Sequence, residues 1–218
     1  MTSCTLPSGG GTTTFTYGSD GLRRSKTSVV GGVSTTTDFV YDGTMLVREL
    51  VVGNGTIQGT YIGELITSVT YFQGPLGPAY RRNDLSGASP HWYVYNGLGS
   101  VVGEVDQLGN LDSYQEYDAY GAPRTYTVAG TPTSRQGYVG QLGHQTDSET
   151  GGLIYMQARY YDPSLGRFIS QDPGGVGNNW FIYASDSPTV LIDATGEDAQ
   201  SVDVFSKQKS WLYTRIWR

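Results

Sequence analysis

Glycine recurs at short intervals along this chain, and this spacing limits the chain to a fold built from short strands. Glycine accounts for 31 of the 218 residues, roughly twice its usual share of about 7%. Between the glycine-containing turns lie short runs rich in Tyr, Thr and Val, which favour strands. Helical periodicity is weak, because glycine and β-branched residues interrupt each window before two helical turns can form. The sequence therefore predicts an all-β protein with many short strands.

Strand–turn–strand units follow one another from Phe15 onward. Asp42-Gly43 and Asn96-Gly97 are the clearest hairpin turn signals. Such turns recur irregularly, roughly every 20 residues, which favours an array of hairpins over a Greek-key sandwich. The Ser/Thr/Gly-rich residues 1–14 are expected to be flexible, and residues 178–184 are the best candidate for a short helix.

The charge pattern and the few Cys and His residues exclude several functions. The net charge is −6 and no basic stripe is present, so we predict no nucleic-acid partner. No secretory signal pattern and no apolar run long enough to span a membrane are found, and we predict no membrane span. Cys4 is alone, so no intrachain disulfide is expected. His91 and His144 lack Cys or carboxylate neighbours at metal-ligand spacing, and we predict neither a metal site nor a cofactor.

The stretch ARYYDPSLGRFISQDPGG, residues 158–175, is the most specific signal in the chain, because several residue types must agree at fixed spacing. Residues 137–173, which include most of it, resemble the Rhs repeat-associated core segment. The run NNWFIYASDSPTVLIDATG, residues 178–196, resembles the end of that core. The YDG at residues 41–43 and residues 95–124 are similar to YD repeats.

The resemblance implies an antiparallel β-hairpin ribbon of YD-repeat/Rhs type, wound into a partial spiral shell with little helix. Bacterial members of this family enclose a toxin made by their own C-terminal region. The expected parts are a flexible N-terminal segment (1–14), YD-like hairpin repeats (15–90), the Rhs repeat-associated core (91–196) and a C-terminal tail (197–218).

The resemblance also implies partners and a location. The expected partners are the rest of an Rhs shell or copies of the same chain, together with a C-terminal cargo peptide. Export or display at the cell surface, as part of a larger assembly, is the location that the family implies.

A third implication is self-cleavage by a pair of aspartates. The family carries two DPxG-type motifs near its cleavage point, the second followed by leucine. Here the first motif is Asp172-Pro173-Gly174-Gly175, and the second, 21 positions later, is Asp193-Ala194-Thr195-Gly196. The second motif departs from the pattern, since Ala194 replaces proline and Glu197 replaces leucine. By the family's position, the bond at risk is Glu197–Asp198.

Elementary chemistry says what such a pair can do. Two carboxylates in close contact cannot both ionise easily, so one keeps a proton while the other acts as a base toward water. A nearby arginine holds a carboxylate ionised or binds the developing oxyanion, and Arg159 and Arg167 are the candidates. Because the scissile bond is tethered beside the acid, a single-turnover reaction needs no substrate binding.

A purely structural interpretation accounts for the same residues. Asp before Pro or Gly opens turns, and Asp162-Pro163, followed by Gly166, fits a type I turn. Tyr160 and Tyr161 fit a strand with buried rings. Arginines commonly pair with such aspartates to order loops.

Three hypotheses for function remain open. The first is a scaffold or encapsulation segment of an Rhs-type polymorphic toxin or cell-surface protein, with vestigial aspartyl autoproteolysis near Glu197. The second is a non-catalytic structural protein that self-assembles through β-strand exchange into a filament or oligomer. The third, weaker hypothesis is a carbohydrate-binding surface module that uses Tyr and Trp.

Overall fold

The structure is a computed structural model of the 218-residue chain. It describes residues 1–5, 11–57, 60–85, 87–124, 130, 133–175, 178–197 and 199–201. Asp198 and residues 202–218, which make up most of the predicted tail, lie outside the described residues.

The larger part of the fold is one ten-stranded antiparallel sheet in which each strand pairs with the next strand along the chain. This connectivity confirms the predicted all-β hairpin ribbon. Its strands are β1 (Ser3–Thr5), β2 (Thr12–Tyr17), β3 (Arg23–Val30), β4 (Val33–Asp42), β5 (Met45–Ile57), β6 (Thr60–Gly74), β7 (Gly77–Asn83), β8 (His91–Tyr95), β9 (Val101–Val105) and β10 (Leu111–Tyr114).

One turn design recurs between strands of this sheet and in the short hairpin β11 (Glu116–Tyr117)–β12 (Pro123–Arg124) that follows it. In the Asx-x-x-Gly turn, an Asn or Asp accepts backbone N–H bonds with its side chain, and the glycine three positions later has a positive φ. Asn96, Asp106 and Asp118 each accept two such bonds of 2.8–3.0 Å through one side-chain oxygen. The matching glycines have φ of 78°, 83° and 91°, a region that side chains with a Cβ disfavour.

The described residues from 133 onward form a smaller unit, here called the closing module. Its four-stranded sheet contains β13 (Gln145–Asp147), β14 (Leu153–Met156), β15 (Arg159–Asp162) and β16 (Arg167–Phe168), and a two-stranded sheet pairs β17 (Leu191–Asp193) with β18 (Ala199–Ser201). The hairpin β11 (Glu116–Tyr117)–β12 (Pro123–Arg124) precedes it. Its short 3-10 helices are η2 (Gly140–Leu142), η3 (Ser148–Thr150) and η4 (Ala184–Asp186).

The helix predicted over residues 178–184 is wrong, because only Ala184 belongs to a helical element, η4. The Asn179 side chain accepts the N–H of Phe181 at 3.2 Å, which is a local turn bond that competes with a helix. Ser185, in the middle of η4, has φ of 51°, so the element cannot extend as a regular helix.

Two other expectations concern the division of the chain into parts. Of the expected flexible segment 1–14, residues 6–10 lie outside the described residues, while the described ones contain β1 and the start of β2, and Thr13 is buried against the closing module. The ten-stranded sheet also runs without a break across the boundary expected at residue 90, since β7 pairs with β8.

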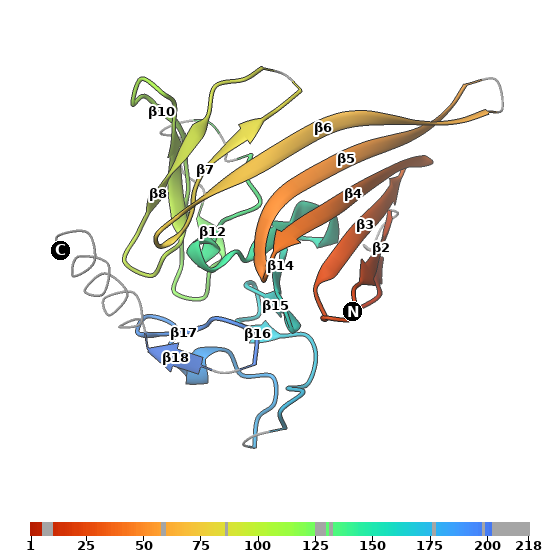
Figure 1. The fold of residues 1–218 in the computed structure, drawn as a ribbon. Coiled ribbons are helices and arrows are strands. Elements are labelled where there is room, and N and C mark those ends of the chain that lie inside the picture. Colours follow the sequence, from red (N-terminus) through yellow and green to blue (C-terminus); the bar gives the residue numbers. More distant parts are fainter. Residues whose placement is uncertain are drawn as a thin grey trace.

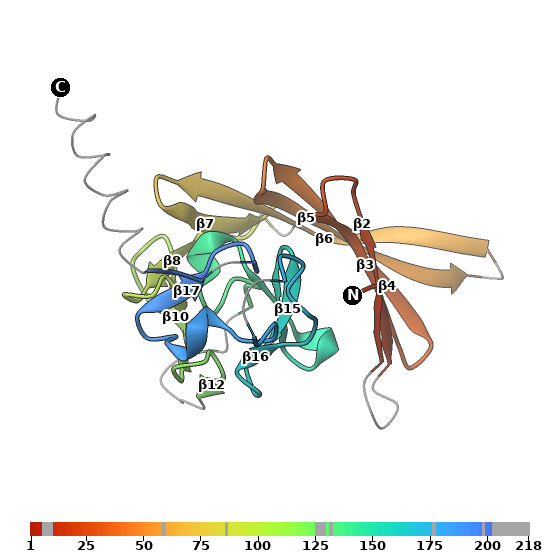
Figure 2. The ribbon, with the colours of Figure 1, turned by 90° about the horizontal axis from the view of Figure 1, so that it is seen from below.

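The large sheet curves around the closing module, which lies on one of its faces (Figures 1 and 2). The closing module has its own core of buried side chains, which are Tyr138, Val139, Ile154, Met156, Tyr161, Phe168, Tyr183, Ala184 and Ile192. Within the part of the chain that the structure describes, no helix has the length and apolar character needed to cross a membrane.

Buried charges join the sheet to the closing module. Arg23 on β3 forms an ion pair with Asp147 on β13, and both side chains are completely buried. Lys26 reaches Asp147 at 3.1 Å and Glu149 at 2.8 Å. Arg135 binds Glu49 on β5 at 2.9 Å and Asp147 at 3.2 Å. These six residues, here called the docking network, contain equal numbers of cations and anions.

The docking network generates the first prediction. The substitution Asp147→Asn removes the anion shared by three cations and leaves Arg23 and Lys26 buried without it. We expect the free energy of unfolding to fall by about 3–5 kcal/mol, measured by urea denaturation at neutral pH. The control Asp38→Asn changes an exposed aspartate on β4, and its effect should stay within about 0.5 kcal/mol. Equal effects of the two substitutions would show that the network does not hold the module in place.

Candidate functional site

The adjacent tyrosines of the YYDP motif point to opposite faces of β15. Tyr160 packs with Phe15 and Tyr155, and its hydroxyl accepts a hydrogen bond from Arg23 at 3.1 Å. Tyr161 lies in the core of the closing module and donates to the Tyr120 carbonyl at 2.6 Å. Both rings are at most 2% exposed. The pair therefore joins β15 to the large sheet on one side and to the module's own core on the other.

The Asp162-Pro163 segment is a turn between β15 and β16. One oxygen of Asp162 accepts the N–H groups of Ser164 at 2.9 Å and Leu165 at 3.3 Å. Gly166 has φ of 66°, and a Cβ there would lie 2.9 Å from the Tyr120 ring. These contacts are those of a turn that requires glycine for both conformation and space.

Arg159 is the centre of the candidate site. It begins β15 and is 4% exposed, and its guanidinium carbon lies 3.7 Å from the centre of the Phe168 ring. Its Nε donates to the carbonyl oxygen of Gly196, and its Nη1 donates to the carbonyl oxygen of Trp180 at 3.1 Å. The cation is thereby fixed against two loops that are distant from it in sequence.

The same guanidinium meets both aspartates of the predicted pair. Arg159 Nη2 lies 3.4 Å from Asp193 Oδ2 and 3.7 Å from Asp172 Oδ2. The shared arginine partner brings the first residues of the two DPxG-type motifs close to each other in space. Three of the four predicted catalytic residues are therefore neighbours.

Asp193 is the more enclosed of the two aspartates. Its Oδ1 accepts the N–H groups of Gly196 at 2.7 Å, Glu197 at 3.1 Å and Thr195 at 3.3 Å. Burial raises the pKa of Asp193 above its usual value, and the opposing effects of the Gly196 N–H and the Arg159 charge only partly offset it. A buried carboxyl group with a raised pKa holds a proton more readily than an exposed one.

Asp172 is the more accessible aspartate, with 14% of its side chain exposed. It opens a turn in which its Oδ1 accepts the N–H of Gly174 at 2.7 Å and its carbonyl accepts the N–H of Gly175 at 3.1 Å. Its own N–H donates to the Trp180 carbonyl at 3.0 Å. The same Trp180 carbonyl oxygen also accepts from Arg159, so both Asp172 and Arg159 are hydrogen-bonded to one backbone group.

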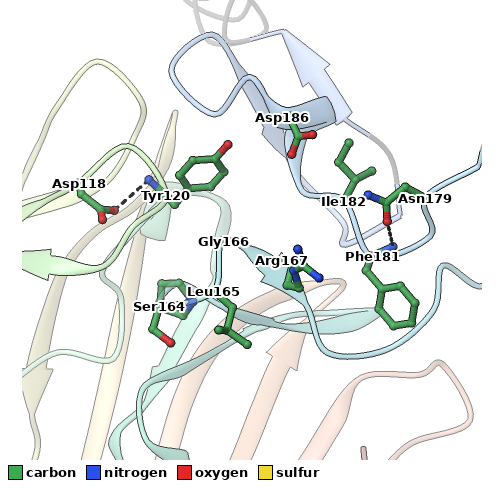
Figure 3. Close-up of a pocket in the computed structure, with 11 residues that line it drawn as sticks. Asp118, Tyr120, Ser164, Leu165, Gly166, Arg167, Asn179, Phe181, Ile182 and Asp186 are labelled. Carbon is green, nitrogen blue, oxygen red and sulfur yellow. Dashed lines mark hydrogen bonds between the residues drawn. The ribbon is translucent and has the colours of Figure 1, made fainter.

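Arg167, the fourth predicted catalytic residue, lies elsewhere. Its backbone lies opposite that of Asp162 in the β15–β16 pairing, and it lines a separate pocket of about 350 Å³. Figure 3 shows Arg167 among Gly166, Phe181 and Ile182, with Asp118 and Asp186 on the rim. Among the described residues, no hydrogen bond or ion pair of the Arg167 side chain is found. The expectation that Arg167 assists the aspartates is therefore not met, because alternation along β16 directs it away from them.

A second cavity, of about 520 Å³, borders the loop that follows Asp193. Thr195 and Glu197 line it together with Tyr17 and Tyr160, and residues from the start of the chain complete its wall. The loop that carries the predicted cleavage point is thus open to water. Of the two residues at that point, Glu197 is exposed, and Asp198 lies outside the described residues.

Sequence reasoning missed His144 as a neighbour of this loop. Its Nε2–H donates to the Ala194 carbonyl at 3.2 Å, and burial lowers the pKa of His144 to about 4. The ring is therefore neutral at physiological pH, with the proton on Nε2. No spacing pattern could have revealed this contact, because His144 and Ala194 are 50 positions apart and come together only in the folded module. The described residues hold no cluster of His, Cys, Asp or Glu suited to a metal ion.

No family model matches the chain, but comparisons with curated proteins and solved structures do find relatives. The chain is 32% identical over 189 residues to the tRNA3(Ser)-specific nuclease WapA of Bacillus spizizenii, covering 84% of this chain and 7% of that protein. It is 36% identical over 107 residues to the toxin subunit YenC1 of Yersinia entomophaga, covering 48% of this chain and 11% of that subunit. It therefore spans only a small part of the length of these relatives.

Two further matches agree with these. The chain is 46% identical over 54 residues to the toxin protein Tse5 of Pseudomonas aeruginosa, covering 24% of this chain and 4% of that protein. The crystal structure of TcdB2-TccC3-TEV superposes with a TM-score of 0.67 at 22% identity, covering 85% of this chain and 9% of that one. At this identity the structural likeness shows the fold alone.

His144 gives a prediction of how stability depends on pH. Its folded-state pKa, about 4, lies below the unfolded value of 6.5. Between these values the unfolded chain binds the proton more readily, so stability should fall as the pH is lowered from 6.5 to about 4. The shift corresponds to a loss of about 3 kcal/mol.

Urea unfolding at pH 7 and pH 4.5, for the unmodified chain and His144→Gln, measures this contribution. The raised pKa of Asp193 acts in the opposite direction, because its protonation favours the folded state. The comparison with His144→Gln, rather than the unmodified profile alone, isolates the histidine. An unchanged pH dependence in His144→Gln would contradict the assignment.

Proposed function

We propose that this chain, which is related to the Rhs-type toxin proteins, forms a wall-and-closure segment of a toxin-enclosing β shell. The continuous hairpin ribbon from β1 to β10 supports the role of a wall. The closing module, held on one face of that wall by the docking network, supports the role of a closure. Its expected partners are the remaining strands of such a shell and a cargo joined at the C-terminal side. Export as part of a larger assembly fits this role.

The proposal includes self-cleavage at the end of the closing module. The observation that supports it is the single buried Arg159 guanidinium, which binds both Asp172 and Asp193 and also the carbonyl of Gly196. In this scheme Asp172, the more accessible carboxylate, takes a proton from water. Asp193, with its raised pKa, supplies a proton to the leaving amine. Arg159 stabilises the negative charge that develops on the carbonyl oxygen.

A second candidate is a scaffold without chemistry, and it also has a specific observation in its favour. Asp172 and Asp193 both open Asx-x-x-Gly turns of the kind seen at Asn96, Asp106 and Asp118. In that case Arg159 only orders the two loops. The strands β1 and β10 at the two sides of the sheet would then serve for pairing with copies of the chain.

Intact-mass measurement of the purified 218-residue chain over several days, at mildly acidic and neutral pH, distinguishes the two candidates. We expect a fragment that ends close to Glu197 and accumulates at a rate independent of protein concentration, because the reaction is intramolecular. In Asp172→Asn and Asp193→Asn we expect a rate reduced by at least about 100-fold.

The control Asp38→Asn, an exposed carboxylate on β4, should cleave at the unmodified rate. Folding of each variant is checked by thermal unfolding. Persistence of full-length chain under all conditions, with the fold intact, would exclude self-cleavage. Light scattering on the same samples would then reveal whether the chain assembles, as the scaffold candidate requires.

A further inference from the structure

The pocket around Arg167 combines opposite charges with apolar side chains. Its walls come from four segments that are distant in sequence, namely the β11–β12 turn, residues 163–167, residues 179–182 and η4. Its volume of about 350 Å³ is at the lower end of the range of about 300–1,000 Å³ that is typical of ligand pockets. We propose that this pocket binds a small zwitterion of the amino-acid or short-peptide type, which carries a carboxylate, an ammonium group and an apolar body.

Arg167 supplies the binding group for the carboxylate. Alternation along β16 places Arg167 on the pocket side, while the next residue, Phe168, lies in the core of the closing module. A guanidinium carries five N–H donors, and within the described part of the chain no acceptor is found for those of Arg167. Because a guanidinium binds a planar carboxylate through two parallel hydrogen bonds, Arg167 fits a carboxylate on a ligand.

Asp118 and Asp186 bring negative charge to two other walls of the same pocket (Figure 3). Asp118 Oδ1 accepts the N–H groups of Tyr120 and Ala122, each at 2.9 Å, and among the described residues no bond to its Oδ2 is found. A ligand with only negative charge would be repelled by the two aspartates, and a ligand with only positive charge would be repelled by Arg167. A zwitterion avoids both repulsions.

The apolar part of the pocket wall is formed by Leu165, Phe181 and Ile182. Leu165 is 64% exposed and Phe181 is 36% exposed. Large apolar side chains that face water beside one hollow gain free energy when an apolar group covers them. The pocket should therefore favour an aliphatic or aromatic side chain on the ligand over a strongly polar one.

The wall that carries Asp186 has a strained backbone. Ala184, Ser185 and Asp186 have φ of 48°, 51° and 57°, in the left-handed region that residues with a Cβ disfavour. Tyr183 and Ala184 are buried, which holds this turn in place. Backbone strain of this kind is concentrated at ligand-binding and active sites, where it fixes the position of a side chain. Here it fixes Asp186 at the rim of the pocket.

Calorimetric titration of the 218-residue chain tests the proposal with ligands that share one apolar body. L-Leucine and L-leucyl-L-leucine carry both charged groups, N-acetyl-L-leucine carries only the carboxylate, and L-leucinamide carries only the ammonium group. We expect at least one of the two zwitterions to bind about tenfold or more tightly than both singly charged ligands, because each of these lacks one charged hydrogen-bonding group. The tighter zwitterion shows whether the pocket suits a free amino acid or a short peptide. Binding of neither zwitterion, or equal binding of all four ligands, would overturn the proposal.

Two variants assign the charged groups of the pocket. In Arg167→Gln we expect the affinity for the tighter zwitterion to fall about tenfold or more, and in Asp186→Asn we expect a smaller fall, because Asp118 remains. The controls Arg24→Gln and Asp38→Asn change exposed residues on β3 and β4 and should leave the affinity unchanged.

Thermal unfolding checks the fold of each variant and gives a second readout. The tighter zwitterion should raise the Tm of the unmodified chain and leave the Tm of Arg167→Gln unchanged, because only a ligand that binds the folded state stabilises it. An affinity in Arg167→Gln equal to that of the unmodified chain would place the ligand elsewhere on the molecule and contradict the proposal.

Discussion

The way in which the closing module sits on the large sheet depends on the buried ion pair between Arg23 and Asp147, because the two completely buried side chains come from the two different parts of the chain. Phe15, Tyr155 and Tyr160 form only a small cluster between the large sheet and the closing module. Leu98, in the turn between β8 and β9, also packs against the module's core. At Arg23 the contact is polar, and an ion pair removed from water costs desolvation energy that hydrogen bonds must offset. Here Gln145 and Tyr160 supply such bonds to Arg23, at 2.6 and 3.1 Å. Charges fix orientation more strictly than apolar contacts do, so the network sets how the module sits on the sheet.

The docking network and the candidate site are linked by β15, which carries a residue in contact with each of them. Tyr160 contacts Arg23 of the docking network, and Arg159, its neighbour in sequence, holds Asp172 and Asp193. Alternation along the strand directs the two side chains to opposite faces. A shift of the module on the sheet would move Arg159 along with Tyr160. Asp172 and Asp193 also belong to the closing module, so the network anchors β15 on the large sheet, whereas contacts within the module hold Arg159 beside the two aspartates.

The parts of this structure that depend on interactions between residues close in sequence could be predicted from the sequence. Strand-forming runs and Asx–Gly turns predict the hairpin order, since each turn is closed within five residues. The 21-residue spacing between Asp172 and Asp193 correctly suggested that they lie near each other. The sequence did not predict contacts between distant residues, nor the face of a strand to which a given side chain points. Arg167 and Arg159 look equivalent in sequence, and only the alternation and the loop contacts of the fold separate them. His144 was found only through a contact with Ala194, 50 positions away.

The Asx-x-x-Gly turn explains why the second motif keeps its geometry although two residues depart from the family pattern. Asp193 Oδ1 accepts N–H groups from Thr195, Gly196 and Glu197, and none of these bonds comes from Ala194. Proline lacks an N–H, so alanine in its place removes no donor. The first motif carries Pro173 at the equivalent position, beside the same type of turn. At position 197 only the backbone N–H takes part, so glutamate serves as well as leucine. The positions at which the turn does depend on a side chain, or on the lack of one, are Asp193 and Gly196, and both retain the residue that the geometry requires.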